Sequence, residues 1–243
     1  MLNHNITPGA DVAPGAGPDD GTLVRLPGAI FIHYPRAKTI RTQLQLFARG
    51  KVGGPKQRCT FMVGPTGSGK STLIKIAFPE ETRQIRRVNG HNKLDVLLVE
   101  APQNGTAKAI LTEVLLALNL PARGTAQELM HTAIKVLTSL ETKLLIIDET
   151  QQFTAGDYQV ADMIKTLVNK LPCRLLFVGL SDLRQFARIN PQLAHRLALQ
   201  VEVPSFDWNV EADEKAFRTI LKKAQQTSAN YFAECDITKN SIP

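Results

Sequence analysis

Short, strongly apolar runs alternate with segments of helical periodicity from Cys59 to Val203. The runs are "CTFMVG", "DVLLVEA", "KLLIIDE", "CRLLFVGL" and a shorter one, "LQVEV". Runs this apolar are typical of strands buried on both faces, as in a mostly parallel sheet that helices cover on each side. The pattern therefore predicts an α/β fold with a three-layer αβα arrangement.

Between these runs, apolar residues recur every three or four positions, which is the spacing of an amphipathic helix. In the first such segment Ile40, Leu44 and Phe47 share one side, and the helix should stop near Gly50. The spacing predicts helices over 37–48, 69–78, 106–118, 125–140, 157–171, 182–188, 191–198 and 211–226.

The two ends of the chain differ from its middle. Residues 1–27 are rich in Gly, Pro, Ala and Asp, so we expect a flexible tail or an arm that orders against a partner. Residues 28–203 carry the alternating pattern and form the predicted main domain. Residues 204–243 read as a linker and one amphipathic helix, which is short for a second domain.

Charge and cysteine content narrow the possible functions. The chain has 29 Lys and Arg against 22 Asp and Glu, a formal charge of +7. This balance favours a polyanion such as nucleic acid, although ordinary solubility charge explains it equally well. Cys59, Cys173 and Cys235 match no metal-ligand spacing, and the first two open apolar runs, so core packing is expected for them. Few cysteines fit a reducing cytosol, and no apolar run approaches the ~20 residues of a membrane span. We therefore expect a cytoplasmic protein with no membrane partner.

The stretch Gly64-Pro65-Thr66-Gly67-Ser68-Gly69-Lys70-Ser71 fits the pattern GxxxxGK[ST], with a predicted strand before it and a predicted helix after it. In such a loop the backbone N–H groups turn around phosphate oxygens, and the helix N-terminus adds its dipole. Lys70 would neutralise the β and γ oxygens, and the Ser71 hydroxyl would bind Mg²⁺. With the adjoining Thr72, this loop predicts a site for ATP and Mg²⁺.

The run "KLLIIDE" supplies acidic groups for the same site. Its strand ends at Asp148, where a carboxylate can hold the metal, and Glu149 follows as a candidate general base. The next strand, "RLLFVG", leads to Ser181, which is either a sensor of the γ-phosphate or the N-cap of the next helix. An Asp-Glu pair and a further strand favour an ATPase of the additional-strand type. A metabolic phosphotransferase would need a lid with clustered arginines, and we find none in the sequence.

These motifs resemble AAA+ ATPases, and within them the TniB/TnsC-type ATPases of transposons. The resemblance rests on "IHYPRAKTI", "LLIIDETQQFTAGD" and "INPQLAHRLALQVEVPSFDW", and it covers roughly residues 32–208. It implies the P-loop AAA+ fold with an incomplete C-terminal lid. It also implies that the first segment, with Tyr34, borders the adenine pocket. In the family an arginine of the third segment reaches the ATP of a neighbouring subunit, and Arg196 holds that position. Arg188 is the second candidate, and a surface salt bridge is the alternative role for either arginine.

The resemblance further implies ATP-dependent rings or helical filaments around duplex DNA. Such assemblies mark a target site and stimulate a separate transposase, together with a target-selection adaptor protein. The loops after the second strand would contact DNA, and the residues with suitable chemistry are Asn104, Thr106, Lys108, Arg123 and Thr125. No base-reading motif is visible, so binding should be nonspecific. The alternatives are an ordinary exposed turn for these residues and a DNA-independent switch for the protein.

Overall fold

The computed structural model describes residues 24–26, 29–31, 34–103, 105–152, 158–171, 173–180 and 191–228. The chain divides into two compact units, of which the larger is Pro35–Phe217. The smaller unit combines Met1–Tyr34 with Arg218–Pro243. Its described elements are an antiparallel pair, β1 (Val24–Leu26) and β2 (Ala29–Phe31), and the C-terminal part of helix α8 (Glu211–Ser228).

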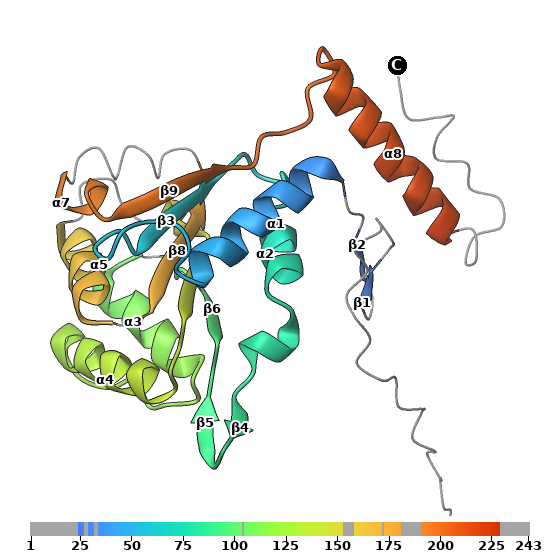
Figure 1. The fold of residues 1–243 in the computed structure, drawn as a ribbon. Helices are drawn as coiled ribbons and strands as arrows, with labels where there is room; N and C mark the ends of the chain where they lie inside the picture. Colours follow the sequence, from blue (N-terminus) through green and yellow to red (C-terminus); the bar gives the residue numbers. More distant parts are fainter. Residues whose placement is uncertain are drawn as a thin grey trace, which may run out of the picture. The chain divides into compact units, whose positions relative to one another are not determined.

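A five-stranded sheet runs through the larger unit in the order β6-β7-β8-β3-β9, and every neighbouring pair is parallel (Figure 1). Strand β8 lies between β3 and β7, so one strand separates the phosphate loop strand from the acidic strand. This confirms the expected α/β class and the additional strand. The strands are β3 (Cys59–Val63), β6 (Val96–Glu100), β7 (Leu144–Asp148), β8 (Arg174–Gly179) and β9 (Leu197–Glu202).

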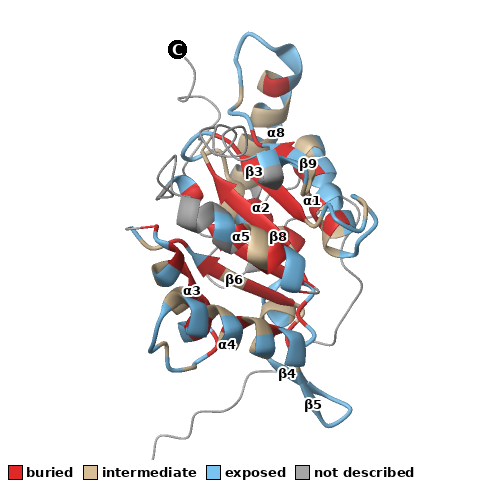
Figure 2. Ribbon diagram, turned by 90° about the vertical axis from the view of Figure 1, so that its left-hand side faces the viewer, coloured by how far each residue is buried: buried red, intermediate tan, exposed pale blue. Residues whose placement is uncertain are grey.

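Helices bury both faces of this sheet. Every residue of β3 and β7 is buried, which explains why these strands, apart from Thr60 and Asp148, are continuously apolar instead of alternating. Figure 2 shows the buried strand β3. Cys59, Phe61 and Val63 of β3 belong to one core cluster with residues of α3, α4 and α5. The described α-helices of this unit, besides the start of α8, are α1 (Pro35–Ala48), α2 (Lys70–Ala77), α3 (Ala107–Leu116), α4 (Ala126–Ser139), α5 (Tyr158–Lys170) and the single turn α7 (Pro191–Ala194). Two short 3-10 helices, η1 (Glu80–Arg83) and η2 (Thr150–Gln152), are also described.

Several elements differ from the expectation. The helix predicted over 191–198 ends at Ala194, because residues from Leu197 onward pair with β3 as strand β9. The helix predicted over 182–188 lies outside the described residues. A short hairpin of β4 (Arg86–Val88) and β5 (His91–Lys93) was not predicted, since its residues show no apolar alternation. Strand β1 lies within the segment that we assigned to the tail.

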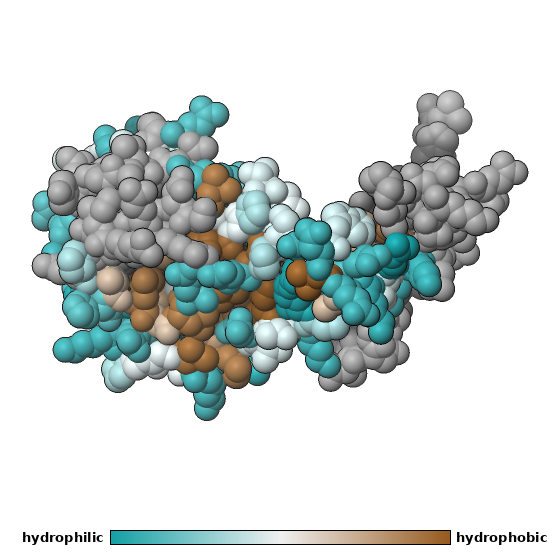
Figure 3. Space-filling view, turned by 90° about the horizontal axis from the view of Figure 1, so that it is seen from above, coloured by the Kyte–Doolittle hydropathy of each residue, from teal (hydrophilic) through white to brown (hydrophobic). Residues whose placement is uncertain are grey.

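The surface is mixed in character. On the face seen in Figure 3, hydrophobic side chains gather near the middle and hydrophilic ones border them. None of the helices that the structure describes is both long enough and apolar enough to cross a membrane. The exposed large hydrophobic side chains among the described residues are Leu46, Ile85, Val88, Leu116, Trp208 and Val210.

Candidate nucleotide-binding site

The glycine-rich loop leaves the C-terminal end of β3 and turns directly into α2. Gly67 and Gly69 have φ angles of 76° and 88°, a left-handed conformation that glycine adopts without strain. At Gly64 an added Cβ would lie 2.2 Å from the carbonyl oxygen of Val203, so only glycine fits there. The first N–H groups of helix α2, which begins at Lys70, have no acceptors within the helix, as in every helix. The residue before it, Gly69, provides no side-chain cap for them. This geometry suits an anion such as a phosphate group.

Two polar side chains of the loop are suited to the same ligand. The Lys70 ammonium donates to the carbonyl oxygens of Gly64 and Pro65, both at 2.8 Å, which holds it over the loop. The Ser68 hydroxyl oxygen is buried and has no hydrogen-bond partner among the described residues. A buried hydroxyl without a partner is costly, and a phosphate oxygen would satisfy it.

The loop and the acidic strand meet at Ser71 and Asp148. The Ser71 hydroxyl donates to Oδ2 of Asp148 at 2.7 Å, and the Asp148 residue is only 6% exposed. Oδ1 of Asp148 accepts from the Glu149 N–H at 2.9 Å, which fixes the carboxylate plane. Hydroxyl and carboxylate oxygens are the ligands that Mg²⁺ prefers, in combination with phosphate oxygens of a substrate. The donor set therefore fits the expected metal.

Glu149 is exposed next to this pair and adopts φ of 58°, which is uncommon for a residue with a side chain. Such strain persists where the surroundings enforce it, and it is frequent at functional sites. The buried Thr150 hydroxyl donates to the Val178 carbonyl at 2.8 Å, which ties the end of β7 to the end of β8. The Gln151 side-chain amide donates to the Glu149 carboxylate.

The remaining nucleotide candidates are less defined by the structure. Thr72 is exposed on α2, two residues after Lys70. Tyr34 is half-buried immediately before α1 and belongs to the smaller unit, so its place beside adenine stays a prediction. Ser181 and Arg188 lie outside the described residues.

Arg196 lies at the N-terminal end of strand β3, whereas the glycine-rich loop of the same chain lies at its C-terminal end. The Arg196 carbonyl accepts from the Cys59 N–H at 3.1 Å, at the start of β3, whereas Gly64 follows the end of that strand. A strand of five residues separates these two ends by about 16 Å. The Arg196 guanidinium donates through Nε to the side-chain oxygen of Asn169 at 3.2 Å.

A cavity of about 420 Å³ opens beside Arg196, at the N-terminal end of β3. Its described lining carries basic groups and no carboxylate. A polyanion is the ligand that such a lining favours. The lining residues are Pro55, Lys56, Arg58, Val168, Asn169, His195 and Arg196.

Two of the residues predicted to contact DNA cap helices. The Thr106 side chain accepts from the Ala109 N–H at the start of α3, and Thr125 forms a capping box with Glu128 at the start of α4. In the capping box the Glu128 carboxylate accepts from Thr125, and these hydrogen bonds lower its pKa. Lys108 and Arg123 are exposed near these helix starts, whereas Asn104 lies outside the described residues.

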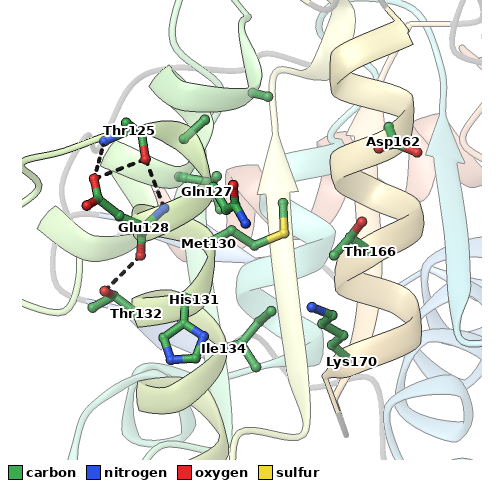
Figure 4. Close-up of a pocket in the computed structure, with 13 residues that line it drawn as sticks. Thr125, Gln127, Glu128, Met130, His131, Thr132, Ile134, Asp162, Thr166 and Lys170 are labelled. Atoms are coloured by element: carbon green, nitrogen blue, oxygen red, sulfur yellow. Dashed lines mark hydrogen bonds between the residues drawn. The ribbon is translucent and has the colours of Figure 1, made fainter.

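A groove of about 1180 Å³ runs beside these helix starts, between α4 and α5. Figure 4 shows Met130 and Ile134 of α4 on the side of the groove that faces α5, with Thr166 and Lys170 opposite them. Thr125 lines the same groove, so one candidate DNA residue borders it.

Three contacts were missed at the sequence level. Thr150 was within reach of sequence reasoning, because a hydroxyl directly after the acidic pair can bond to the neighbouring strand. Gly179 is needed because a Cβ there would lie 2.7 Å from the Thr150 hydroxyl. Asn169 gave no signal, since its contact with Arg196 joins segments 27 residues apart.

The sequence matches a known protein family, and the structure is similar to solved structures of other proteins. A family model described as "Bacterial TniB protein" matches residues 25–208, which is most of the chain. No curated protein matches the sequence.

Several solved structures share the fold at low identity. The ORC2 protein of Aeropyrum pernix, solved in ADPNP–ADP complexes, has a TM-score of 0.54 and 19% identity, over 78% of this chain and 50% of that one. Cdc6p of Pyrobaculum aerophilum has a TM-score of 0.59 and 13% identity, over 84% and 54%. The ORC1 protein of Aeropyrum pernix, solved in complex with DNA, has a TM-score of 0.57 and 15% identity, over 80% and 50%. The chain spans about half the length of these proteins, and its fold is that of the P-loop AAA+ ATPases.

Proposed function

The chain belongs to the TniB family, and on this premise we propose that it is an ATPase that assembles on duplex DNA and marks a target site for a transposase. The observation that carries the proposal is the hydrogen bond between Ser71 and Asp148 at the strand ends next to the phosphate loop. Arg196 lies at the opposite end of the strands. One end has the groups that bind a nucleotide, and the other has the cation that could complete a neighbour's site.

The described residues have distinct roles in nucleotide binding. The loop amides and Lys70 bind the phosphates, and the ammonium exchanges its contacts with the Gly64 and Pro65 carbonyls for phosphate oxygens. Ser71 and Asp148 hold Mg²⁺, which, when bound, neutralises charge on the phosphates. Glu149 lies beside this pair with an exposed carboxylate, in position to take a proton from water.

The cationic cavity around Arg196 supports the assignment of a trans-acting arginine. The phosphate loop of the same chain lies at the far end of β3, so a catalytic role for the Arg196 guanidinium would require the nucleotide of another chain. Positive charge supplied at the γ-phosphate stabilises the transition state and makes hydrolysis depend on assembly. Asn169 keeps the side chain oriented through its hydrogen bond to Nε.

Three observations support duplex DNA as the surface for assembly. The chain has a formal charge of +7, and a protein of similar fold, the ORC1 protein, was solved with DNA. Lys108 is the second residue of α3, where the helix dipole disfavours a cation. A charge at such an unfavourable position is expected to serve binding. Arg123 is a second cation of this kind, near the start of α4. Thr106 and Thr125 would contribute from helix caps, and Asn104 completes the proposed set.

The finer parts of the proposal concern partners and location. A ring or helical filament on DNA would present the same surface repeatedly to a transposase and to a target-selection adaptor protein. The described cysteines, Cys59 and Cys173, are unpaired and buried, which fits the reducing cytoplasm.

The central test is sedimentation of the protein with ATP, with duplex DNA, with both, and with neither. We expect large assemblies only when ATP and DNA are present together. The control is Lys75→Ala, which removes an exposed cation of α2 outside the proposed sites. Assemblies that form with ATP alone, and are unchanged by DNA, would favour the DNA-independent switch instead.

Salt dependence then tests the mode of DNA binding. Contacts to phosphates release counterions, so log Kd should change with log salt concentration by about 0.9 per phosphate contacted. Affinity should be similar for unrelated DNA sequences. Strong preference for one short sequence would contradict the proposal.

A further inference from the structure

The hairpin of β4 and β5 projects from the larger unit as an exposed ribbon. All residues of its strands are exposed except Lys93, which is half-buried, and Figure 2 shows the ribbon extending beyond the end of the sheet. The turn is formed by Asn89 and Gly90, with φ angles of 51° and 83°. Two successive left-handed residues are typical of the tight hairpin turn that Asn-Gly favours. The ribbon is therefore specified by its own turn chemistry.

Ion pairs fasten the base of this ribbon to the body of the unit. Arg86 pairs with Asp95, and Lys143 pairs with the same carboxylate at 2.8 Å. On the other strand Lys93 pairs with Glu141 at 2.7 Å. Such surface pairs are individually weak, but together they limit the directions in which the ribbon can point.

The outer part of the ribbon carries one arginine and no carboxylate. Residues 87–92 contain Arg87 and a histidine, whereas the cations at the base, Arg86 and Lys93, pair with Asp95 and Glu141. Arg87 pairs across the ribbon with Asn92, and within the described part of the chain it has no ion-pair partner. Because cross-strand partners share a face, one face presents a guanidinium and an amide side by side. Both groups donate hydrogen bonds of the kind that phosphate oxygens and base edges accept.

The ribbon and the proposed DNA residue Lys108 adjoin opposite ends of strand β6. The ribbon leads directly into β6, the strand at one end of the sheet order, and α3 follows the other end of that strand. Lys108 of α3 and Arg87 of the ribbon thus flank one edge strand.

We propose that the β4–β5 ribbon is a second DNA-contacting element, which enters a groove of the duplex and places Arg87 against the phosphate backbone. The inference rests on the proposed function, because it assumes that the protein binds DNA. A two-stranded ribbon fits the major groove of a duplex. Ile85 and Val88 are 47% and 39% exposed, so a protein surface is the competing occupant that the experiment must separate.

The experiment measures DNA affinity by fluorescence anisotropy, in the presence of ATP, across a salt series. Arg87→Ala should weaken binding several-fold and reduce the salt slope by about 0.9, the value of one lost phosphate contact. Arg87→Lys should restore the slope, since it keeps the charge. The matched control Lys75→Ala should leave both values unchanged. The ATPase rate of Arg87→Ala without DNA should equal that of the unmodified protein, which shows that the variant is folded.

A positive readout complements the loss of affinity. With Cys235→Ser in place, Asn92→Cys provides an attachment point for a photo-crosslinker, because Cys59 and Cys173 are buried. Crosslinks to duplex DNA that depend on ATP would support the inference. Unchanged affinity and slope in Arg87→Ala, with crosslinks only to a second copy of the protein, would overturn it in favour of a subunit contact. If the unmodified protein binds no DNA, the proposed function itself fails, and this result is distinct from failure of the ribbon alone.

Discussion

The Ser71 hydroxyl donates to the Asp148 carboxylate at 2.7 Å, although 77 positions of sequence separate the two residues. Strand β8 lies between β7, which ends at Asp148, and β3, which precedes the loop and Ser71. The bond links the start of α2 to the end of β7. The hydrogen bond holds the two side chains together before a nucleotide arrives. Both oxygens are of the kind that binds Mg²⁺, so the metal site is arranged in advance.

Asp148→Asn should separate metal binding from nucleotide binding. An amide keeps the shape of the side chain and an oxygen acceptor for Ser71, but it loses the negative charge that attracts Mg²⁺. We expect nucleotide affinity in EDTA to stay near that of the unmodified protein, while the gain on adding Mg²⁺ falls at least tenfold. Titration with a fluorescent ATP analogue in both buffers measures this gain. A full Mg²⁺ effect in the variant would show that Asp148 is not a metal ligand.

Glu149→Gln should bind ATP and hydrolyse it slowly. The amide cannot accept a proton from water, and general-base catalysis typically contributes about 10²–10⁴-fold in rate. Assemblies formed with ATP should therefore persist longer after dilution, as followed by light scattering. The backbone strain at this position is the same for both residues, so folding should be unaffected. Turnover equal to that of the unmodified protein would remove Glu149 from the role of base.

Arg196→Ala should leave ATP binding by the monomer nearly intact and abolish most hydrolysis. Loss of a trans-acting arginine costs about 10³–10⁵ in rate for related chemistry. Lys70→Ala should lose ATP affinity by about 10- to 150-fold, since a charged hydrogen bond contributes ~1.5–3 kcal/mol. Arg49→Ala, at an exposed position after α1, is the control for removal of an arginine.

Mixing the Arg196→Ala and Lys70→Ala proteins gives the sharper measurement. One junction type in a mixed assembly joins an intact loop to an intact arginine, so ATPase activity should recover in part. Normal hydrolysis by Arg196→Ala alone at high protein concentration would contradict the assignment, and Arg188 would be the next residue to substitute.

The buried cysteines predict a loss of stability at alkaline pH. Burial raises the pKa of the Cys173 thiol to about 12 and raises the pKa of the Cys59 thiol further, whereas an unfolded thiol keeps its ordinary pKa of 9.0. Below pH 9 both states are protonated and the contribution is constant. Above it the unfolded chain ionises first, so each thiol lowers the free energy of unfolding by about 1.4 kcal/mol at pH 10.

Urea unfolding at pH 8 and pH 10 measures this effect. Cys173→Ala and Cys59→Ala should each reduce the difference between the two pH values, although each also removes packing volume at both. A pH difference that is the same in both variants as in the unmodified protein would show that other groups cause it.

Sequence patterns predicted the strands of the sheet and the glycine-rich turn between β3 and α2, because local physics determines both. The four consecutive apolar residues 144–147 reflect burial of both faces of β7, and the loop needs glycine at Gly67 and Gly69. The order of the strands was beyond reach, because it depends on pairing between distant segments. The end of α7 was placed four residues too late for the same reason: pairing of β9 with β3 outweighs helical spacing.

The roles of Thr106 and Thr125 show a different limit. Their hydroxyls were predicted to contact DNA, and the structure uses both as helix caps. A threonine that precedes a helix satisfies the backbone first, and the sequence does not reveal whether its hydroxyl also contacts a ligand. Thr125→Asp would keep a side-chain acceptor for the cap but repel a phosphate, so it separates the two roles better than alanine does.

The separation of Arg196 from the phosphate loop of its own chain has a consequence for growth. In the proposed assembly two different surfaces would meet in each contact, so a chain of subunits would have one terminal subunit with an uncompleted nucleotide site and another with an unused arginine. The subunit with the uncompleted site would keep its ATP longest, because no neighbour supplies it with Arg196. Such an assembly would be directional, and a partner that recognises only one terminus could read orientation along the DNA.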